Sequence, residues 1–202
     1  EIRLSLVGSE MCIRDSIYVA DSLQDALKGA SYIQENSPET REVKRSLFPL
    51  LDAAAEADAI IGSSTSSIPA SEFTEDLPGR HRCLVSHPVN PPYLIPVVEL
   101  CPAPWTSADT MARARDIMLD IGQKPVSMTR EIEGFILNRL QGALLHEAFR
   151  LAAAGIASAE DIDATVKDGL GLRWSFMGPF ETIDLNAPGG IADYCGRYGG
   201  LY

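Results

Sequence analysis

The sequence predicts an α/β domain with a largely parallel sheet, followed by an all-helical domain. Short β-rich segments alternate with segments of helical period as far as about residue 128, which is the pattern of βαβ units. Beyond about residue 129 no β-rich segment occurs, and apolar residues recur at helical spacing. With 202 residues, 46% of them hydrophobic, the chain is long enough to bury a sizeable core. We place the domain boundary at residues 127–131.

Six short segments rich in apolar and β-branched residues predict the strands of the sheet. One of them, the AIIG segment, has the continuous apolar character of a strand that is buried on both faces. The six predicted strands are Ile17–Ala20, Ser31–Gln34, Ala59–Gly62, Arg82–Ser86, Val97–Leu100 and Lys124–Met128.

Two helices are predicted among the first three strands. The first covers Asp21–Gly29, with Asp21 or Ser22 as its N-cap and Gly29 as its terminator. The second covers Glu39–Ala57, and Pro49 inside it is expected to kink the helix or to split it in two. The apolar residues expected on its buried face are Val43, Leu47, Leu50, Leu51 and Ala54.

A third helix is predicted before the last strand. Thr106 and Asp109 have the spacing of a capping box at its start, and Gly122 ends it. The residues expected on its apolar face are Met111, Ala114, Met118 and Ile121.

The C-terminal part contains signals for helices alone. We expect one long apolar helix over Gly134–Ala154, ended by Gly155. Ser158 and Asp161 are typical of the start of a second helix. A third helix begins at the MGPFE segment, with Pro179 in its first turn.

The composition excludes several classes of protein. Seventeen Lys and Arg against 28 Asp and Glu give a net charge of −11, and a surface this acidic repels nucleic acids and anionic membranes. No apolar run approaches the roughly 20 residues of a membrane span. The three histidines lack the spacing of metal ligands, so no metal site is expected. The four cysteines form no CxxC pair, and we expect reduced thiols in a cytoplasmic protein: Cys12, Cys83, Cys101 and Cys195.

Ligands of an open parallel sheet bind beyond the carboxyl ends of its strands. The segments expected at these ends are SPET (37–40), SSTSS (63–67) and HPVNPP (87–92). A glycine pair at Gly169 and Gly171 resembles a phosphate-binding loop only superficially, because it lacks the third glycine and follows a helix.

A histidine and a glutamate are the strongest catalytic candidates. His87 lies where a strand ends, and by itself it fits a histidine satisfied by the backbone better than a base. Glu99 lies within the apolar VVEL strand, where a carboxylate is costly unless it is paired. A buried His–Glu pair 12 residues apart on neighbouring strands would be a general base with the group that orients it.

Other polar residues are less distinctive. Asn138, in the long apolar helix, is equally a core hydrogen-bonding group or an active-site donor. Ser66 is one hydroxyl among five in a row. Glu39 and Lys44 are by default an exposed charged pair.

Five segments together resemble the 3-hydroxyacyl-CoA dehydrogenase superfamily, in family order from Ile17 to Tyr202. They are SSTSS, HPVNPPYLIPVVEL, GFILNRLQGALLHEAFRL, EDIDATVKDGLG and MGPFETIDLN. The HPVNPPYLIP, LNRLQ and LRWSFMGP segments are most similar to the lambda-crystallin branch, whose enzyme acts on L-gulonate. The resemblance implies a partial Rossmann-type domain at 17–128 and a truncated helical C-terminal domain at 129–202.

The resemblance also implies roles for individual residues. His87 would take the proton of the substrate's C3 hydroxyl, Glu99 would orient His87, and Ser66 and Asn138 would hold the substrate oxygens. The residues implied on the nicotinamide side of an NAD cofactor are Glu39, Lys44, Ser66 and Asn90.

The function that the resemblance implies is NAD-dependent oxidation of the 3-hydroxyl of an L-3-hydroxy acid of the L-gulonate type. An L-3-hydroxyacyl-CoA is the alternative substrate, and a non-catalytic, crystallin-like structural protein or an inactive fragment is the alternative of another class. A cytoplasmic homodimer is expected.

The sequence departs from the family at both ends. The glycine-rich phosphate loop and the end of the helical domain are missing, and residues 1–16 are expected to be non-native. We therefore expect the 202-residue chain by itself to bind NAD weakly.

Overall fold

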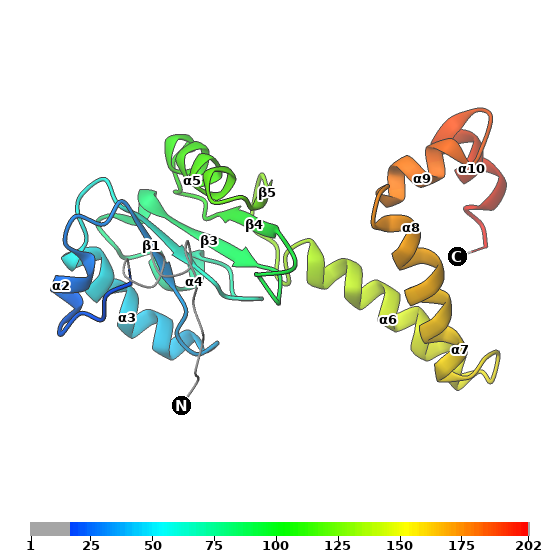
Figure 1. The fold of residues 1–202 in the computed structure, drawn as a ribbon, viewed down its shortest axis with the longest axis horizontal. Coiled ribbons are helices and arrows are strands. Elements are labelled where there is room, and N and C mark those ends of the chain that lie inside the picture. The colour runs from blue at the N-terminus through cyan, green and yellow to red at the C-terminus, as the bar shows by residue number, and fades with distance from the viewer. Residues whose placement is uncertain (1–16, 202) are drawn as a thin grey trace, which may run out of the picture. The chain divides into compact units, whose positions relative to one another are not determined.

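The computed structural model describes residues 17–201 of the chain, which divides after Arg139 into two units (Figure 1). The expectation for residues 1–16, and that for Cys12, lie outside the described residues.

A five-stranded sheet forms the centre of the first unit, in the order β1-β2-β3-β4-β5. All neighbouring strands are parallel except β3 and β4, which are antiparallel. The sheet confirms the predicted α/β domain. The strands are β1 (Tyr32–Glu35), β2 (Ile60–Ser63), β3 (Cys83–Pro88), β4 (Val97–Pro102) and β5 (Lys124–Ser127).

The strand predicted at Ile17–Ala20 is wrong. These residues are exposed and have no regular secondary structure. A β-rich sequence forms a strand when a neighbouring strand pairs with its backbone, and no strand of the described residues lies against this segment.

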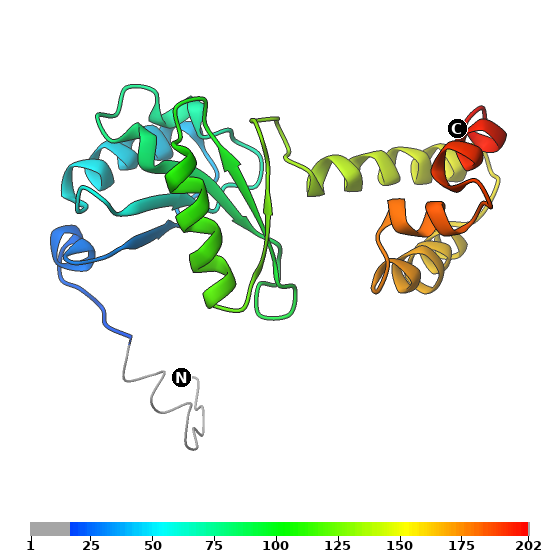
Figure 2. The same ribbon diagram turned by 90° about the horizontal axis from the view of Figure 1, so that it is seen from above.

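Helices cover both faces of the sheet, with α3 on one side and α5 on the other (Figure 1). Figure 2 shows α5 from its own side, lying along the strands. The apolar core is accordingly split into two clusters, one that includes Phe48 and Leu51 of α3 and one that includes Ala114 and Met118 of α5. The helical elements of the first unit are α2 (Leu23–Leu27), α3 (Arg41–Ala54), α4 (Ser71–Thr74), the 3₁₀ turn η1 (Arg80–Arg82) and α5 (Ala108–Asp120).

Helix α3 is continuous through Pro49, so of the two predicted outcomes, a kink or a split, the split is wrong. The predicted buried face is also displaced, because Leu50 is 58% exposed. The buried residues follow the spacing i, i+4, i+7 and i+8 of one helix face, and that face includes two charged residues: Lys44, Phe48, Leu51 and Asp52.

The ends of α2 and α5 are set by side-chain caps and by glycines. Ser22 is the N-cap of α2, as one of the two predictions had it. The N-cap of α5 is Ser107, whose hydroxyl accepts from the Thr110 amide, so the predicted capping box at Thr106 is wrong. The Thr106 hydroxyl instead donates to the Cys83 carbonyl and accepts from the Ala103 amide.

The end of α5 agrees with prediction in part. Gly122, with a φ of 81°, follows the helix where the sequence predicts its end. Ile121 was expected on the apolar face, but it lies past the last helical residue and is exposed.

The described residues of the second unit form helices joined by turns and contain no strand, as predicted. Ser158 caps α7 through the Asp161 amide, and Pro179 opens α9. The Gly169–Gly171 segment lies in a π-helix and not in a loop. The helical elements are α6 (Leu137–Ala153), α7 (Ala159–Ala164), the π-helix η2 (Thr165–Gly171), α8 (Leu172–Trp174), α9 (Pro179–Leu185) and α10 (Gly190–Tyr198).

Helix α6 begins at Leu137, three residues later than Gly134, where it was predicted to begin. Gly134 and Phe135 both have left-handed backbone, with φ of 73° and 49°. A non-glycine residue in this conformation costs roughly 1–2 kcal/mol. The chain therefore turns sharply before the helix, and the residues around it must stabilise that turn.

No helix in residues 17–201 is long and apolar enough to cross a membrane.

The displaced face of α3 leads to a stability prediction. We expect Phe48→Ala to lower the free energy of unfolding by about 3–5 kcal/mol, because Phe48 is fully buried. Leu50→Ala, on the exposed side of the same helix, should change it by less than about 0.5 kcal/mol. Urea denaturation of both variants measures the two effects, and equal losses would contradict the described face.

Candidate active site

His87 and Glu99 form a buried pair on neighbouring strands. They lie directly opposite each other in the antiparallel register of β3 and β4. Nδ1 of His87 is 2.8 Å from Oε2 of Glu99, and the two residues are 5% and 2% exposed. Because an ionised carboxylate can only accept hydrogen bonds, Nδ1 carries a proton, and in the neutral form of the ring Nε2 is the nitrogen with the lone pair. The pair has the arrangement of a general base with its orienting group.

The other carboxylate oxygen of Glu99 binds the start of α6. Oε1 accepts hydrogen bonds from the amides of Ile136 (2.8 Å) and Leu137 (2.9 Å). Burial raises the pKa of Glu99, but the hydrogen bonds from His87, Leu137 and Ile136 outweigh it, so the pKa lies below its ordinary value of 4.5. The amides at a helix start also favour a negative charge. Glu99 therefore remains a carboxylate near neutral pH.

The serine-rich loop after β2 is held by Glu39. Its Oε1 atom accepts hydrogen bonds from the Thr65 hydroxyl (2.6 Å) and from the amides of Ser66 (2.9 Å) and Ser67 (3.1 Å). Burial raises the pKa of Glu39, but these hydrogen bonds and the charge of Lys44 lower it overall. Glu39 thus fixes the conformation of the loop that carries Ser66.

Asn138 and Ser66 also meet. The Asn138 side-chain amide, in the first turn of α6, donates to the Ser66 carbonyl at 2.7 Å. The structure thereby brings residues from the β2 loop and from α6 together, although 72 residues separate them in the sequence.

Lys44 is buried, whereas the sequence by itself predicts that it is exposed. It is 1% exposed, and its ammonium lies 2.9 Å from Oε2 of Glu35 and 3.3 Å from the Ser63 hydroxyl. The Ser63 hydroxyl also donates to the same Glu35 oxygen, at 2.6 Å. A buried ammonium requires such an anion, so Lys44 and Glu35 depend on each other.

Glu35 is not among the site residues predicted from the sequence. One signal could have revealed it, because Glu35 alternates with the buried Ile33 along β1 and so occupies a core-facing position of the strand. Phe135 and the amides of Ile136 and Leu137 are not among the predicted site residues either, because no residue-type pattern marks them.

Asn90 is not brought to this cluster by any hydrogen bond of the described residues. It is exposed, in the turn between β3 and β4, directly before the cis peptide bond to Pro91.

The arrangement fits proton transfer from a hydroxyl group. His87 supplies the acceptor, while the Ser66 loop and Asn138 place polar groups at the edge where β2 and β3 end. This edge is where open parallel sheets bind nucleotide cofactors.

Two family models match the chain. The 3-hydroxyacyl-CoA dehydrogenase NAD-binding domain matches residues 9–132, and the 3-hydroxyacyl-CoA dehydrogenase C-terminal domain matches residues 134–200.

Three proteins illustrate the similarity. A lambda-crystallin homolog of Bos taurus is 48% identical over 177 residues, which are 88% of this chain and 55% of that protein. A 3-hydroxyacyl-CoA dehydrogenase of Gibberella moniliformis is 44% identical over 85% of this chain and 53% of its own. The crystal structure of an NAD⁺-dependent 5-formyl-3-hydroxy-2-methylpyridine 4-carboxylic acid 5-dehydrogenase is 32% identical, with a TM-score of 0.83, over 90% of this chain and 58% of that one. The chain thus spans little more than half the length of each.

The lowered pKa of Glu99 makes the folding free energy depend on pH. The carboxylate stabilises the folded state fully above its ordinary pKa of 4.5, and this stabilisation is lost as the pH falls through the lower folded-state pKa. We expect the unfolding free energy of the wild type minus that of Glu99→Gln to be largest near neutral pH and to shrink below pH 4.5.

Urea denaturation at several pH values measures this difference. Glu147→Gln is the control, because the ion pair of Glu147 with Arg150 is exposed and should contribute little at any pH. A Glu99→Gln difference that stays constant with pH would contradict the ionised state of Glu99.

Proposed function

The chain belongs to the 3-hydroxyacyl-CoA dehydrogenase family, and from that premise we propose that the whole protein is an NAD-dependent dehydrogenase. The proposed reaction oxidises the 3-hydroxyl of an L-3-hydroxy acid to the 3-keto acid. The observation that carries the proposal is the buried His87–Glu99 pair, with Nδ1 and Oε2 at 2.8 Å.

In this reaction Nε2 of His87 takes the proton from the C3 hydroxyl while the hydrogen on C3 leaves with its electron pair. NAD, when bound, supplies the acceptor for that hydride. The Glu99 carboxylate stabilises the imidazolium that forms, and its hydrogen bond keeps the imidazole ring in one orientation. Ser66 and Asn138 are the proposed donors to the substrate oxygens.

The residues at the carboxyl edge of the sheet fit the nicotinamide side of NAD. We assign Glu39, Ser66 and Asn90 to this side, with Lys44 behind them as a buried cation beneath the edge. The sequence has no G-x-G-x-x-G turn of the kind that holds a pyrophosphate at a helix N-terminus. We therefore assign the pyrophosphate contacts to parts of the whole protein outside this chain.

For the substrate, a small polyol acid of the L-gulonate type is favoured over an acyl-CoA. The similarity to the lambda-crystallin homolog, at 48% identity, supports this choice. The 44% identity to a 3-hydroxyacyl-CoA dehydrogenase keeps the thioester as the second candidate. Turnover of L-gulonate and of an L-3-hydroxybutyryl-CoA by the whole protein with NAD separates the two.

The role of His87 is tested by substitution in the whole protein. We expect His87→Gln to lower kcat by roughly 10²–10⁴, the range for loss of a positioned base. His81→Gln is the matched control, because His81 is exposed in η1 and should leave kcat unchanged. Initial rates of NADH formation measure both variants. If His87→Gln kept more than half of the activity, another group would have to be the base.

The same measurement tests a non-catalytic, structural function. A structural protein would turn over neither substrate, and its function would not depend on the charge of Glu99. Replacing a buried ion pair by apolar residues is often neutral or stabilising, so the presence of the buried His87–Glu99 pair favours the enzyme.

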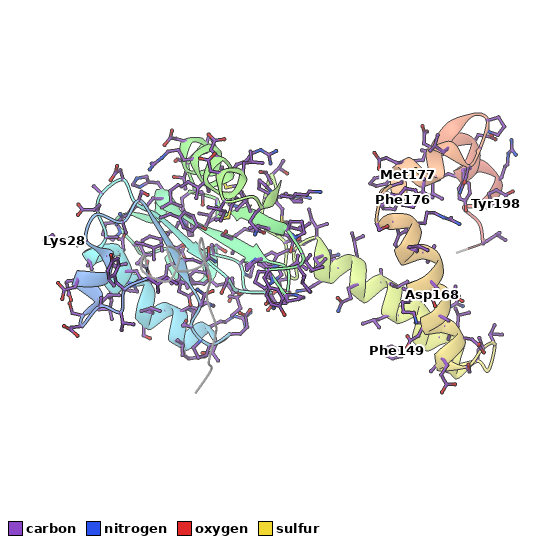
Figure 3. The ribbon with its side chains drawn as sticks, viewed as in Figure 1. Lys28, Phe149, Asp168, Phe176, Met177 and Tyr198 are labelled. Carbon is purple, nitrogen blue, oxygen red and sulfur yellow. The ribbon has the colours of Figure 1, made fainter. Side chains whose placement is uncertain are left out.

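We further propose that the whole protein is a cytoplasmic homodimer that associates through its helical part. Among the described residues from Leu140 onward, Thr182 and Ala187 alone are buried, while many large apolar side chains are exposed. Figure 3 shows Phe149 and Phe176 standing out from their segments. Apolar surface on this scale favours a partner. The buried free thiols of Cys83 and Cys101 agree with a reducing compartment.

Association is tested with Phe180→Glu in the whole protein. Phe180 is exposed in the first turn of α9, where a glutamate is compatible with the helix. We expect the wild type to sediment as a dimer at micromolar concentration and Phe180→Glu to shift toward monomer. Leu50→Glu, at an exposed position of α3, should stay dimeric. A monomeric wild type would refute the dimer.

A further inference from the structure

One short segment, Gly134–Asn138, touches every other candidate catalytic residue. We call it the elbow. The Phe135 ring lies 5.8 Å from the His87 ring between centroids, tilted by 48°. The amides of Ile136 and Leu137 bind Glu99, and Asn138 binds the Ser66 carbonyl.

The backbone of the elbow makes this possible. Gly134 and Phe135 are consecutive left-handed residues, at φ of 73° and 49°. Phe135 is fully buried in the core cluster that also contains Val85 and Cys101 from the two strands of the pair. The next two residues, Ile136 and the first helical residue Leu137, direct their amides at Oε1 of Glu99. The left-handed turn therefore anchors a side chain in the core and presents two amides to the carboxylate.

We propose that Phe135 is a positioning residue of the His87–Glu99 pair, and that the left-handed turn at Gly134–Phe135 is the device by which it acts. This inference rests on the proposed function for its catalytic consequence. The ring packs against His87, while Glu99 accepts two of its three hydrogen bonds from the amides after Phe135. A base that is displaced by a fraction of an ångström loses much of its rate, so the elbow sets kcat without touching substrate.

The backbone of the elbow is tested with Gly134→Ala. An added Cβ at Gly134 finds its nearest atoms at 3.7 Å, so the change acts through the left-handed backbone and not through a clash. Gly122→Ala is the matched control: Gly122 has a φ of 81° and open space, but it follows α5, away from the pair. We expect Gly134→Ala to lower kcat by roughly tenfold to a hundredfold with little change in KM, and Gly122→Ala to leave both unchanged.

Rescue distinguishes positioning from general damage. Asn tolerates left-handed backbone better than Ala, so Gly134→Asn should recover part of the kcat lost in Gly134→Ala. Thermal unfolding should show similar losses for Gly134→Ala and Gly122→Ala. If both variants had the same kcat, the proposal would be overturned.

The side chain is tested with Phe135→Ala against Phe48→Ala. Both remove a phenylalanine that is fully buried, but Phe48 lies on α3 and packs against Phe73 instead of His87. We expect similar losses of stability, and a fall in kcat for Phe135→Ala alone. Phe135→Leu should restore part of that activity, because it refills most of the buried volume. Equal kcat for Phe135→Ala and Phe48→Ala would overturn the proposal.

A spectroscopic measurement separates this inference from the proposed function. The Nδ1 proton of His87, hydrogen-bonded to Glu99, gives its own NMR signal, which His87→Gln assigns among the three histidines. We expect Gly134→Ala to shift or broaden it and Gly122→Ala to preserve it. The signal is present whether or not a substrate is turned over. An unchanged signal in Gly134→Ala would overturn the inference, whereas absence of turnover in the wild type would overturn the proposed function alone.

Discussion

The rest of the site depends on the hydrogen bonds that the buried Glu99 carboxylate accepts. A carboxylate that is 2% exposed must have its charge satisfied by hydrogen bonds, since burying it unpaired is prohibitive. Its partners come from two places, the imidazole of His87 on β3 and the amides of Ile136 and Leu137 at the start of α6. Folding the sheet therefore also fixes where α6 begins, and with it the position of Asn138.

Two other glutamates at the same edge work by the same principle. Glu35 is neutralised by the buried Lys44 and by the Ser63 hydroxyl, and Glu39 by the amides and hydroxyl of the serine-rich loop. The chain carries a net charge of −11, yet each of these carboxylates is compensated locally. The strong overall acidity thus describes the surface, while the candidate site is built from paired charges.

The two units differ in how they are stabilised. The first unit has two apolar clusters, on the two faces of the sheet, and they include fully buried side chains such as Phe48, Leu84 and Phe135. The described part of the helical unit has little buried apolar surface of its own. Helices in proteins derive most of their stability from packing, so the helical unit needs a further surface to cover it. This requirement is the physical basis of the proposed homodimer.

The sequence by itself determined the features that depend on near neighbours along the chain. Ser22 and Ser158 cap their helices and Gly122 follows α5, because capping and left-handed backbone are set within a few residues. The pairing of His87 with Glu99 followed from a carboxylate inside an apolar strand, and the roles of Glu39 and Ser66 came from family resemblance alone. Only the tertiary structure decided that Lys44 is buried against Glu35, that Thr106 binds the Cys83 carbonyl instead of capping α5, and that Phe135 turns into the core. These features depend on which distant surfaces meet, and a local pattern of residue types does not contain that information.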